Sequence, residues 1–201
     1  MLDHATGGRF VPGMGAGWYV DEHHAFGIPL PPMGERWDRC EATVETIAAL
    51  FSDAARIAPG VTRNGPYPLL GATNDPPPLR PGGPPIWLGV GGPRGIALAE
   101  RLAQGWPMPG NRPGDVAYFA QVRDQIRRAL DGVGRDPDEF TDAAQLSCGA
   151  TPATRAEALA TARAFVAAGA NHVIPGLPAS VAPEGLDAMV RKGAEPLTAG
   201  R

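Results

Sequence analysis

The sequence predicts an α/β fold in which helices wrap a parallel sheet. Short apolar segments alternate with helical segments five times along the chain, and this alternation is typical of parallel sheets. Residues 86–90 form an almost fully apolar run, as expected for a parallel strand that is buried on both faces. A doubly wound sheet and a (β/α)8 barrel both fit this order. Five units cannot close an eight-stranded barrel, however, and 201 residues fall short of the roughly 250 that are typical of that fold.

The length and composition predict a soluble globular chain that is one domain or a large piece of one. Apolar residues make up 43% of the sequence and the formal net charge is −3, so the chain offers no basic face for nucleic acid and no polybasic patch for a membrane. No segment approaches the roughly 20 apolar residues of a membrane span, and the start of the chain lacks the features of a signal peptide. Cys40 and Cys148 have no metal-ligand spacing, which predicts free thiols in a reducing cytoplasm.

The chain begins with a predicted helix end and a strand. Residues 1–6 fit the last turn of a helix that Gly7 and Gly8 close, because glycine tolerates the left-handed conformation at which helices stop. Residues 9–14 predict the first strand. Pro12 lies inside it and removes one ladder donor, so we expect a bulge or an edge there.

A loop, a helix and a proline-rich excursion follow. Residues 22–32 are polar and contain prolines, which predicts a loop. Apolar residues at three-four spacing predict a helix over residues 34–52. Residues 56–85 are rich in proline and glycine, and we expect a long excursion with a small hairpin there. A low-complexity linker is the alternative, although loops of this length are usually functional or disordered.

The rest of the chain predicts a regular series of strands and helices. Their sequence signals are apolar periodicity and, before the third helix, a threonine cap at Thr151 or Thr154. The predicted elements are a helix at 96–104, a strand or turn from residue 105, a helix at 115–130, a strand at 140–149, a helix ending at 168, a strand at 171–174 and a helix at 183–192.

Two glycine-rich strand exits are the main candidates for a ligand site. Gly13, Gly15 and Gly17 alternate at the end of the first strand, and such glycines let a flat or bulky ligand approach the backbone. The run 91–95 lies between a strand and a helix, where free N–H groups and the helix dipole favour a phosphate and Arg94 could add a contact. A tight turn without a ligand is the alternative, since the spacing matches neither a dinucleotide fingerprint nor a Walker loop. Parallel α/β folds bind ligands at this end of the strands.

The polar residues after the first strand allow fewer conclusions. Trp18 could be a stacking platform for a flat ring or a core aromatic. Glu22, His23 and His24 could be metal ligands, but no further ligand set is evident, so we predict no metal site and a solvated position for His24. No nucleophile–base arrangement and no carboxylate pair stands out, so the catalytic residues stay unassigned. In an enzyme of this kind a cofactor should carry the chemistry.

Several motifs along the chain carry a family resemblance. They are Leu2-Asp3-His4, Gly7-Gly8-Arg9-Phe10, Gly13-Met14-Gly15-Ala16-Gly17-Trp18, Gly34-Glu35-Arg36, Pro84-Pro85-Ile86-Trp87, Gly91-Gly92-Pro93-Arg94, Ala103-Gln104-Gly105-Trp106 and Ala168-Gly169-Ala170-Asn171-His172-Val173. In combination they resemble the luciferase-like monooxygenase family, most closely its branch of oxidoreductases that depend on coenzyme F-420. The resemblance covers essentially the whole chain. Gln104 departs from it, because an acidic residue is common at that position in the family.

The resemblance implies a partial (β/α)8 barrel made of about the last five βα units. Residues 1–201 would form a single domain with a Pro/Gly-rich insertion at about 56–85. The first three units of the family have no counterpart in this sequence, which leaves two explanations: a fragment, or a shortened product that pairs with another chain. An open barrel exposes strand edges, so we expect self-association or a homo-oligomer.

The resemblance also implies a cofactor at the carboxyl ends of the strands. This would be coenzyme F-420, or alternatively FMN, acting on a small-molecule substrate by hydride transfer or, with FMN, by oxygen activation. A catalytically incompetent fragment that binds only phosphate or a partner chain is the alternative. The implied phosphate contacts are Gly91, Gly92, Pro93 and Arg94, and the residues along the ring or the ribityl chain are Gly15, Ala16, Gly17, Trp18 and Asp21.

Overall fold

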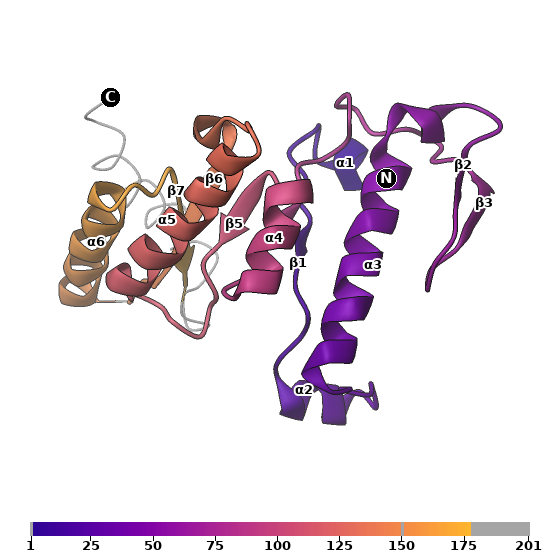
Figure 1. The fold of residues 1–201 in the computed structure, drawn as a ribbon. Coiled ribbons are helices and arrows are strands. Elements are labelled where there is room, and N and C mark those ends of the chain that lie inside the picture. Colours follow the sequence, from indigo (N-terminus) through magenta and orange to yellow (C-terminus); the bar gives the residue numbers. More distant parts are fainter. Residues whose placement is uncertain (1, 150, 178–201) are drawn as a thin grey trace. The chain divides into compact units, whose positions relative to one another are not determined.

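The structure is a computed structural model that describes residues 2–149 and 151–177. It contains two compact units, residues 1–105 and residues 106–201. Figure 1 labels the elements along the chain. Among the described helices, none is long and apolar enough to cross a membrane.

The first unit is built on parallel strands. β1 (Gly13–Met14) pairs with β4 (Trp87–Leu88), so that Gly13 lies opposite Trp87 and Met14 opposite Leu88. β4 also pairs in parallel with β5 (Gly105–Pro107), with Trp87 opposite Gly105. The predicted parallel α/β arrangement is confirmed, and the segments that follow β1 and β4 leave neighbouring strands at the same end.

Both β1 and β4 are shorter than the sequence predicts. Residues 9–14 were expected to form a strand, but only Gly13 and Met14 do, because Pro12 has no N–H with which to continue the ladder. The Pro12 carbonyl still accepts a hydrogen bond from Trp87 N at 2.9 Å. The predicted strand at 86–90 narrows to β4, since Ile86 N donates to the side-chain Oε1 of Gln104 at 2.8 Å rather than to a strand.

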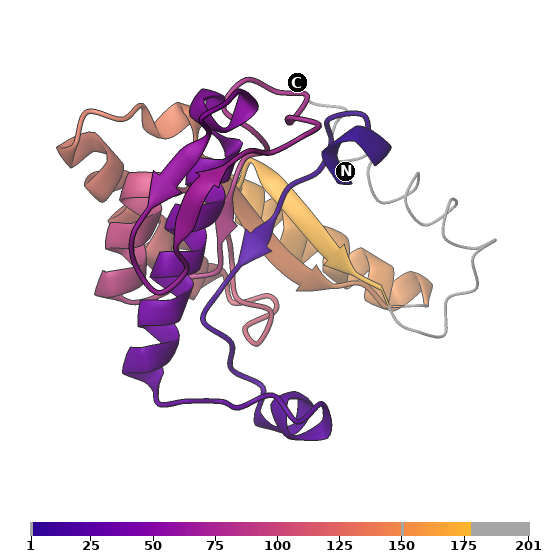
Figure 2. The same ribbon diagram turned by 90° about the vertical axis from the view of Figure 1, so that its right-hand side faces the viewer.

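The loop predicted for residues 22–32 is wrong over its first part, where the chain forms the short helix α2 (Val20–Ala25). Asp21 and Glu22 lie in its first turn, and His24 lies in its last turn. That charge order suits the helix dipole. Gly27, with a φ of 64°, follows the helix end. In Figure 2 the coil after β1 leads to α2 and then returns to the start of α3.

The other helices of the first unit agree with the predictions. α1 (Leu2–Ala5) is a helix end, and Gly7 and Gly8 follow it with φ values of 60° and 78°. α3 (Met33–Phe51) matches the predicted helix at 34–52. α4 (Pro93–Leu102) begins three residues before the predicted 96–104, because proline is well tolerated in the first turn.

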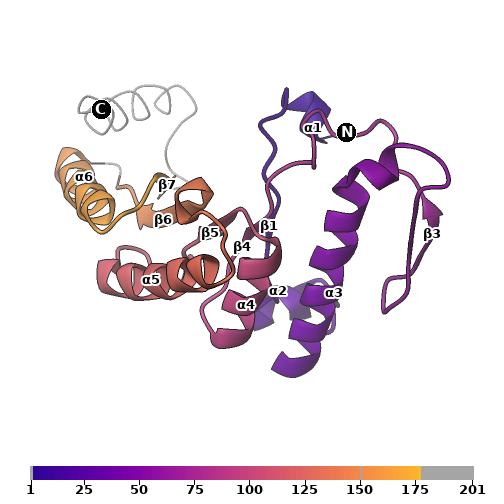
Figure 3. The ribbon, with the colours of Figure 1, turned by 45° about the horizontal axis from the view of Figure 1, so that its top comes forward.

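The proline-rich excursion contains the predicted hairpin. After the 3₁₀ helix η1 (Asp53–Arg56), β2 (Val61–Arg63) and β3 (Leu69–Ala72) pair in antiparallel fashion. Gly60 has a φ of 77°, and a Cβ there would lie 2.5 Å from Ala72 O, so only glycine fits. The hairpin contacts α3, and Figure 3 shows it beside that helix.

A surface line of ion pairs joins α3 to α4 and to the hairpin. Glu41 on α3 accepts from Arg94 at 3.0 Å and from Arg101 at 3.1 Å, both on α4. Glu45, one turn further along α3, pairs with Arg101 at 2.5 Å and with Arg63 of β2. These side chains are a quarter to a half exposed, so solvent weakens each pair.

The second unit packs helices against the parallel strands β6 (Thr141–Ser147) and β7 (His172–Gly176). α5 (Val116–Gly132) and α6 (Pro152–Ala167) carry the helical periodicity that the sequence predicts. Its core contains the fully buried side chains of Trp106, Phe119 and Phe165. The ring centroid of Phe119 lies 5.4 Å from that of Trp106 and 5.3 Å from that of Phe165.

The helix caps and strand limits of the second unit largely confirm the predictions. Asp115 caps α5 by accepting from Tyr118 N at 3.0 Å. Thr151, one of the two predicted candidates, is the N-cap of α6, and Thr154 completes a capping box with it. η2 (Pro137–Glu139) precedes β6. The strands predicted at 140–149 and 171–174 correspond to β6 and β7, and the helix predicted at 183–192 lies outside the described residues.

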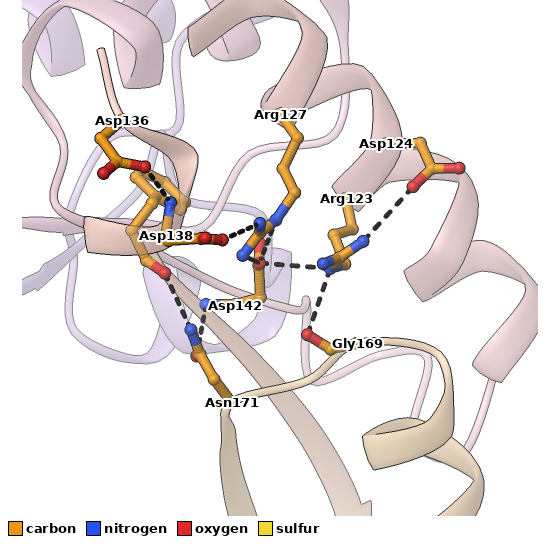
Figure 4. A network of polar contacts seen from close by, with 9 residues as sticks. Arg123, Asp124, Arg127, Asp136, Asp138, Asp142, Gly169 and Asn171 are labelled. Carbon is orange, nitrogen blue, oxygen red and sulfur yellow. Dashed lines mark hydrogen bonds and ion pairs between the residues drawn. The ribbon is translucent and has the colours of Figure 1, made fainter. Parts of the chain in front are cut away.

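Asp142, at the start of β6, is the centre of a buried polar network (Figure 4). Its side chain is fully buried, and its Oδ2 accepts from Arg127 Nε at 2.9 Å and pairs with Arg123 Nε at 3.2 Å. Asn171 joins the two strands, because its Oδ1 accepts from Asp142 N at 2.8 Å and its Nδ2 donates to Phe140 O at 2.9 Å. This network was not anticipated from the sequence.

Candidate functional site

The two glycine-rich exits lie next to each other at the carboxyl ends of β1 and β4. Gly89 N donates to Met14 O at 2.9 Å, and a Cβ on Gly15 would lie 3.7 Å from Gly89 O. The segments 15–18 and 89–94 therefore start side by side, and both leave the carboxyl ends of their strands, as the alternating order of elements predicts. Ligands of parallel α/β folds bind at this end of the strands.

The loop between β4 and α4 offers backbone donors. Gly92 is the N-cap of α4 and Pro93 occupies its first turn, and no side chain caps the helix. The first N–H groups of an α-helix have no intrahelical partner, so this helix start favours an anion. No atom of residues 2–149 or 151–177 lies within 4 Å of the position that a Cβ of Gly92 would occupy. The residues present thus fit the phosphate of a cofactor.

The turn that follows β1 is held by a side chain from α3. Gly17 has a φ of 75°, which favours glycine. Arg36 Nη1 donates to Gly17 O at 2.7 Å. Trp18 is 67% exposed and its ring centroid lies 5.3 Å from that of Tyr19. Of the two alternatives for Trp18, the core aromatic is therefore wrong and an exposed aromatic face remains.

Comparison with protein families identifies the group to which these features belong. A family model described as luciferase-like monooxygenase matches residues 1–199. The chain belongs to the luciferase-like monooxygenase family.

Individual relatives extend this result. A phthiodiolone/phenolphthiodiolone dimycocerosates ketoreductase of Mycobacterium sp. (strain JLS) is 33% identical over 147 residues, which are 70% of this chain and 35% of the relative. The chain thus spans about a third of the length of that relative.

Two solved structures resemble the fold. An F-420-dependent secondary alcohol dehydrogenase, in complex with an F-420–acetone adduct, has a TM-score of 0.70 at 17% identity and matches 95% of this chain and 70% of its own. A coenzyme F-420-dependent tetrahydromethanopterin reductase from Methanopyrus kandleri has a TM-score of 0.68 at 15% identity and matches 94% and 74%. At these identities the likeness concerns the fold, and it confirms the predicted partial (β/α)8 class.

Arg94, predicted from the luciferase-like motifs to contact phosphate, lies at the loop but its guanidinium turns to α3. Its Nη2 donates to Asp38 Oδ1 at 2.6 Å and to Glu41 Oε2 at 3.0 Å. These hydrogen bonds raise the pKa of Arg94 above its ordinary value. The backbone N–H of residue 94, rather than its guanidinium, is therefore the group placed to meet an anion.

The polar residues of α2 do not form a cluster beside the glycine-rich exits. Asp21, Glu22 and His24 are exposed, and the solvated position predicted for His24 is confirmed. His23 is half-buried and its Nδ1 has no hydrogen-bond partner among the described residues. The described part of the chain contains no group of three or more His, Cys, Asp or Glu side chains that could hold a metal ion.

A cavity of about 400 Å³ adjoins the turn after β1, and sequence reasoning missed its main polar residue. Arg36 lies in the first turn of α3, where it is half-buried and reaches Gly17. Nothing in the sequence around Arg36 signals this contact, because the two residues are 19 positions apart. Cys40 in the same wall is a free buried thiol, and burial together with the neighbouring Glu41 raises its pKa. The cavity is lined by Gly13, Met14, Gly15, Ala16, His23, Ile28, Pro29, Leu30, Pro31, Arg36, Arg39, Cys40 and Thr43.

Gln104, the departure from the luciferase-like pattern, has a structural role. Its Oε1 accepts from Ile86 N at 2.8 Å, and its Nε2 donates to Leu102 O at 3.1 Å. Its own N–H donates to Ile86 O at 2.8 Å. The side-chain amide thus joins the residue before β4 to the end of α4. It lies at the start of β4, whereas the glycine-rich exits follow the ends of β1 and β4.

Proposed function

We propose that this chain belongs to an oxidoreductase that binds coenzyme F-420 at the carboxyl ends of β1 and β4 and transfers a hydride between the cofactor and a small-molecule substrate. The observation that carries the proposal is the pairing of two open backbone segments, 15–18 and 89–94, beside an uncapped helix start. Family membership supports the class of reaction, and the two F-420-dependent enzymes of similar fold support the choice of cofactor.

Each part of the site has a distinct task in this proposal. The backbone N–H groups of Gly91, Gly92 and Arg94 bind the cofactor phosphate at the start of α4. The turn of Gly15, Ala16 and Gly17 lies along the ring or its ribityl chain, and Asp21 lies further along the same segment. Trp18 offers an exposed aromatic face for stacking. The deazaflavin ring supplies the hydride chemistry when bound, and the protein orients it.

FMN is the alternative cofactor, with monooxygenation as the reaction. The family is described as luciferase-like monooxygenase, and a phosphate at the start of α4 is common to FMN and F-420. Affinity for the two cofactors separates the alternatives.

A second candidate function is binding without catalysis. β1 pairs with β4 on one side, and no other strand pairs with it in the described part of the chain. An unpaired strand edge of this kind can accept a strand of another polypeptide. In this reading the chain binds phosphate or a partner chain, or associates with itself through that edge.

Titration of the purified chain with oxidised F-420, reduced F-420 and FMN tests the proposal. We expect saturable binding of F-420, and its loss when Gly92 is replaced by leucine, because the side chain would occupy the open space in front of the helix start. Gly132→Leu is the matched control, since Gly132 also has open space around it and lies in the second unit. Absence of binding at high micromolar cofactor would favour the second candidate.

A further inference from the structure

The charged or chargeable side chains around the cavity beside the turn after β1 are all basic. Its charged or chargeable side chains are His23, Arg36 and Arg39, and its other polar side chains are the hydroxyl of Thr43 and the thiol of Cys40. No carboxylate among the described residues lines it. Arg39 is already paired with Glu35 at 2.5 Å, which leaves Arg36 as the uncompensated cation.

Arg36 is unusual among the arginines of the first unit because no carboxylate of the described residues pairs with it. Six of the eight arginines in residues 1–105 form an ion pair, and only Arg36 and the exposed Arg9 form none with a described residue. The Nη1 of Arg36 donates to Gly17 O, while its Nε is buried without a hydrogen-bond partner. A partly buried cation without a counter-ion is costly, so the position calls for an anion.

Further polar groups belong to residues that line the same cavity. His23 Nδ1, on a different element, is also buried without a partner among the described residues. Pro12 O and Met14 O accept from β4. In a parallel ladder the N–H and C=O of one residue point to the same side, so the backbone groups of Gly13 point away from β4. Gly13 lines the cavity.

The remaining lining is apolar. Met14, Ile28, Leu30 and two prolines complete the wall, and a volume of about 400 Å³ suits a small organic molecule. We infer that this cavity binds a small organic anion, whose carboxylate or phosphate head meets Arg36 and His23 and whose apolar body packs on Met14, Ile28 and Leu30. The cavity shares Gly15 and Ala16 with the proposed cofactor site, but the inference rests on Arg36 and His23, which the cofactor proposal does not use.

Calorimetric titration with butyrate, butyl phosphate and butylamine tests the inference. We expect saturable binding of one or both anions and none of butylamine, which has the same apolar body and the opposite charge. The affinity for the anion should fall at least tenfold in Arg36→Gln and stay unchanged in Arg101→Gln, an arginine of α4 that lies outside the cavity lining. The two anion arms distinguish a carboxylate from a phosphate ester as the preferred head group.

Equal affinity of the wild type and Arg36→Gln, or equal binding of butylamine, would overturn the inference. Because Arg36 also holds the Gly17 turn, His23→Leu provides a second variant that leaves that hydrogen bond in place. It should weaken anion binding at least threefold, and an unchanged affinity would again count against the site. Gly92→Leu should keep butyrate binding, so failure of the proposed cofactor site and failure of this cavity give different results.

Discussion

Asp142 in the second unit and Arg36 in the first unit are charged side chains with opposite surroundings. Asp142 is fully buried, and Arg123 and Arg127 both pair with its carboxylate. Arg36 is half-buried, and its guanidinium reaches one backbone carbonyl and no carboxylate. The first is enclosed by partners from its own unit, whereas the second leaves donors unused beside a cavity.

The difference separates stability from binding. A buried charge that has its partners within the protein holds elements together, and removing one partner leaves the others unpaired. A charge without a counter-ion beside a cavity gives little to the fold and is available to a ligand. Substitutions in the two regions should therefore differ in which quantity they change.

The largest effect is expected for Asp142→Ala. The two guanidinium groups would lose their buried partner, which costs about 3 to 5 kcal/mol of unfolding free energy. Urea denaturation measures this loss. Asp138→Ala is the control, because Asp138 also pairs with Arg127 but its side chain is 87% exposed, and it should cost less than about 1 kcal/mol. Similar values for the two variants would show that the Asp142 network is not a special source of stability.

Substitutions of two glycines in the β4–α4 segment should also differ in their effect on unfolding free energy. A Cβ on Gly95 would lie 2.6 Å from Val90 Cβ and 2.9 Å from the ring of Trp37, so Gly95→Ala should cost about 1 to 3 kcal/mol by overpacking. Gly92→Ala meets no atom within 4 Å and should change unfolding free energy by less than about 0.5 kcal/mol. Thermal denaturation checks both, and a Gly92→Ala variant as unstable as Gly95→Ala would contradict the open loop.

Protonation of Asp142 should make the unfolding free energy depend on pH. Burial raises its pKa, and the pairing with Arg127 and Arg123 opposes this effect without cancelling it. The folded chain then holds this proton more tightly than the unfolded chain, so the stabilisation is complete below the unfolded pKa and is lost as the pH rises through the folded pKa. The loss is about 1.4 kcal/mol for each pH unit between the two values.

Urea unfolding of the wild type and of Asp142→Asn across the acid range checks this dependence. The difference in unfolding free energy between the two proteins should fall as the pH rises, because the asparagine does not titrate. A difference that grows with pH would mean that the two arginines lower the pKa instead.

The smallest effect is expected on the ion-pair line between α3 and α4. Arg101 pairs with Glu41 and Glu45, and its side chain is 50% exposed. Arg101→Ala should cost less than about 1 kcal/mol, and salt should reduce the cost further. Denaturation at low and high ionic strength measures this cost. A loss above that value that does not depend on salt would show that these surface ion pairs stabilise the fold as the buried Asp142 network does.

Sequence periodicity predicted the long helices well, because their signals are local. The three-four spacing of apolar residues located α3 and α5, and the threonine pair at 151 and 154 located the start of α6. The glycine exits were also placed correctly at neighbouring strand ends, since parallel alternation fixes which end of each strand carries them. The strand lengths were wrong, because one proline and one glutamine side chain end the ladders.

The residues that carry charge could not be predicted in the same way. Arg127 and Asp142 are 15 positions apart and meet only through packing of α5 on β6. Arg36 has the sequence surroundings of an ordinary arginine in the first turn of a helix, and its burial depends on the turn at Gly17. Helix α2 was missed because it is only six residues long and buries none of them, so no apolar face marked it.

The central claim is that coenzyme F-420 binds at the two glycine-rich exits. The most direct test follows the backbone amides of these exits during titration with the cofactor. In NMR spectra of the labelled chain, the amides of Gly91, Gly92 and Arg94 should shift saturably, together with those of Gly15 and Gly17, while the amide of Gly132 should stay unmoved. Amides of these exits that do not respond to the cofactor, or that respond no more than Gly132, would contradict the account.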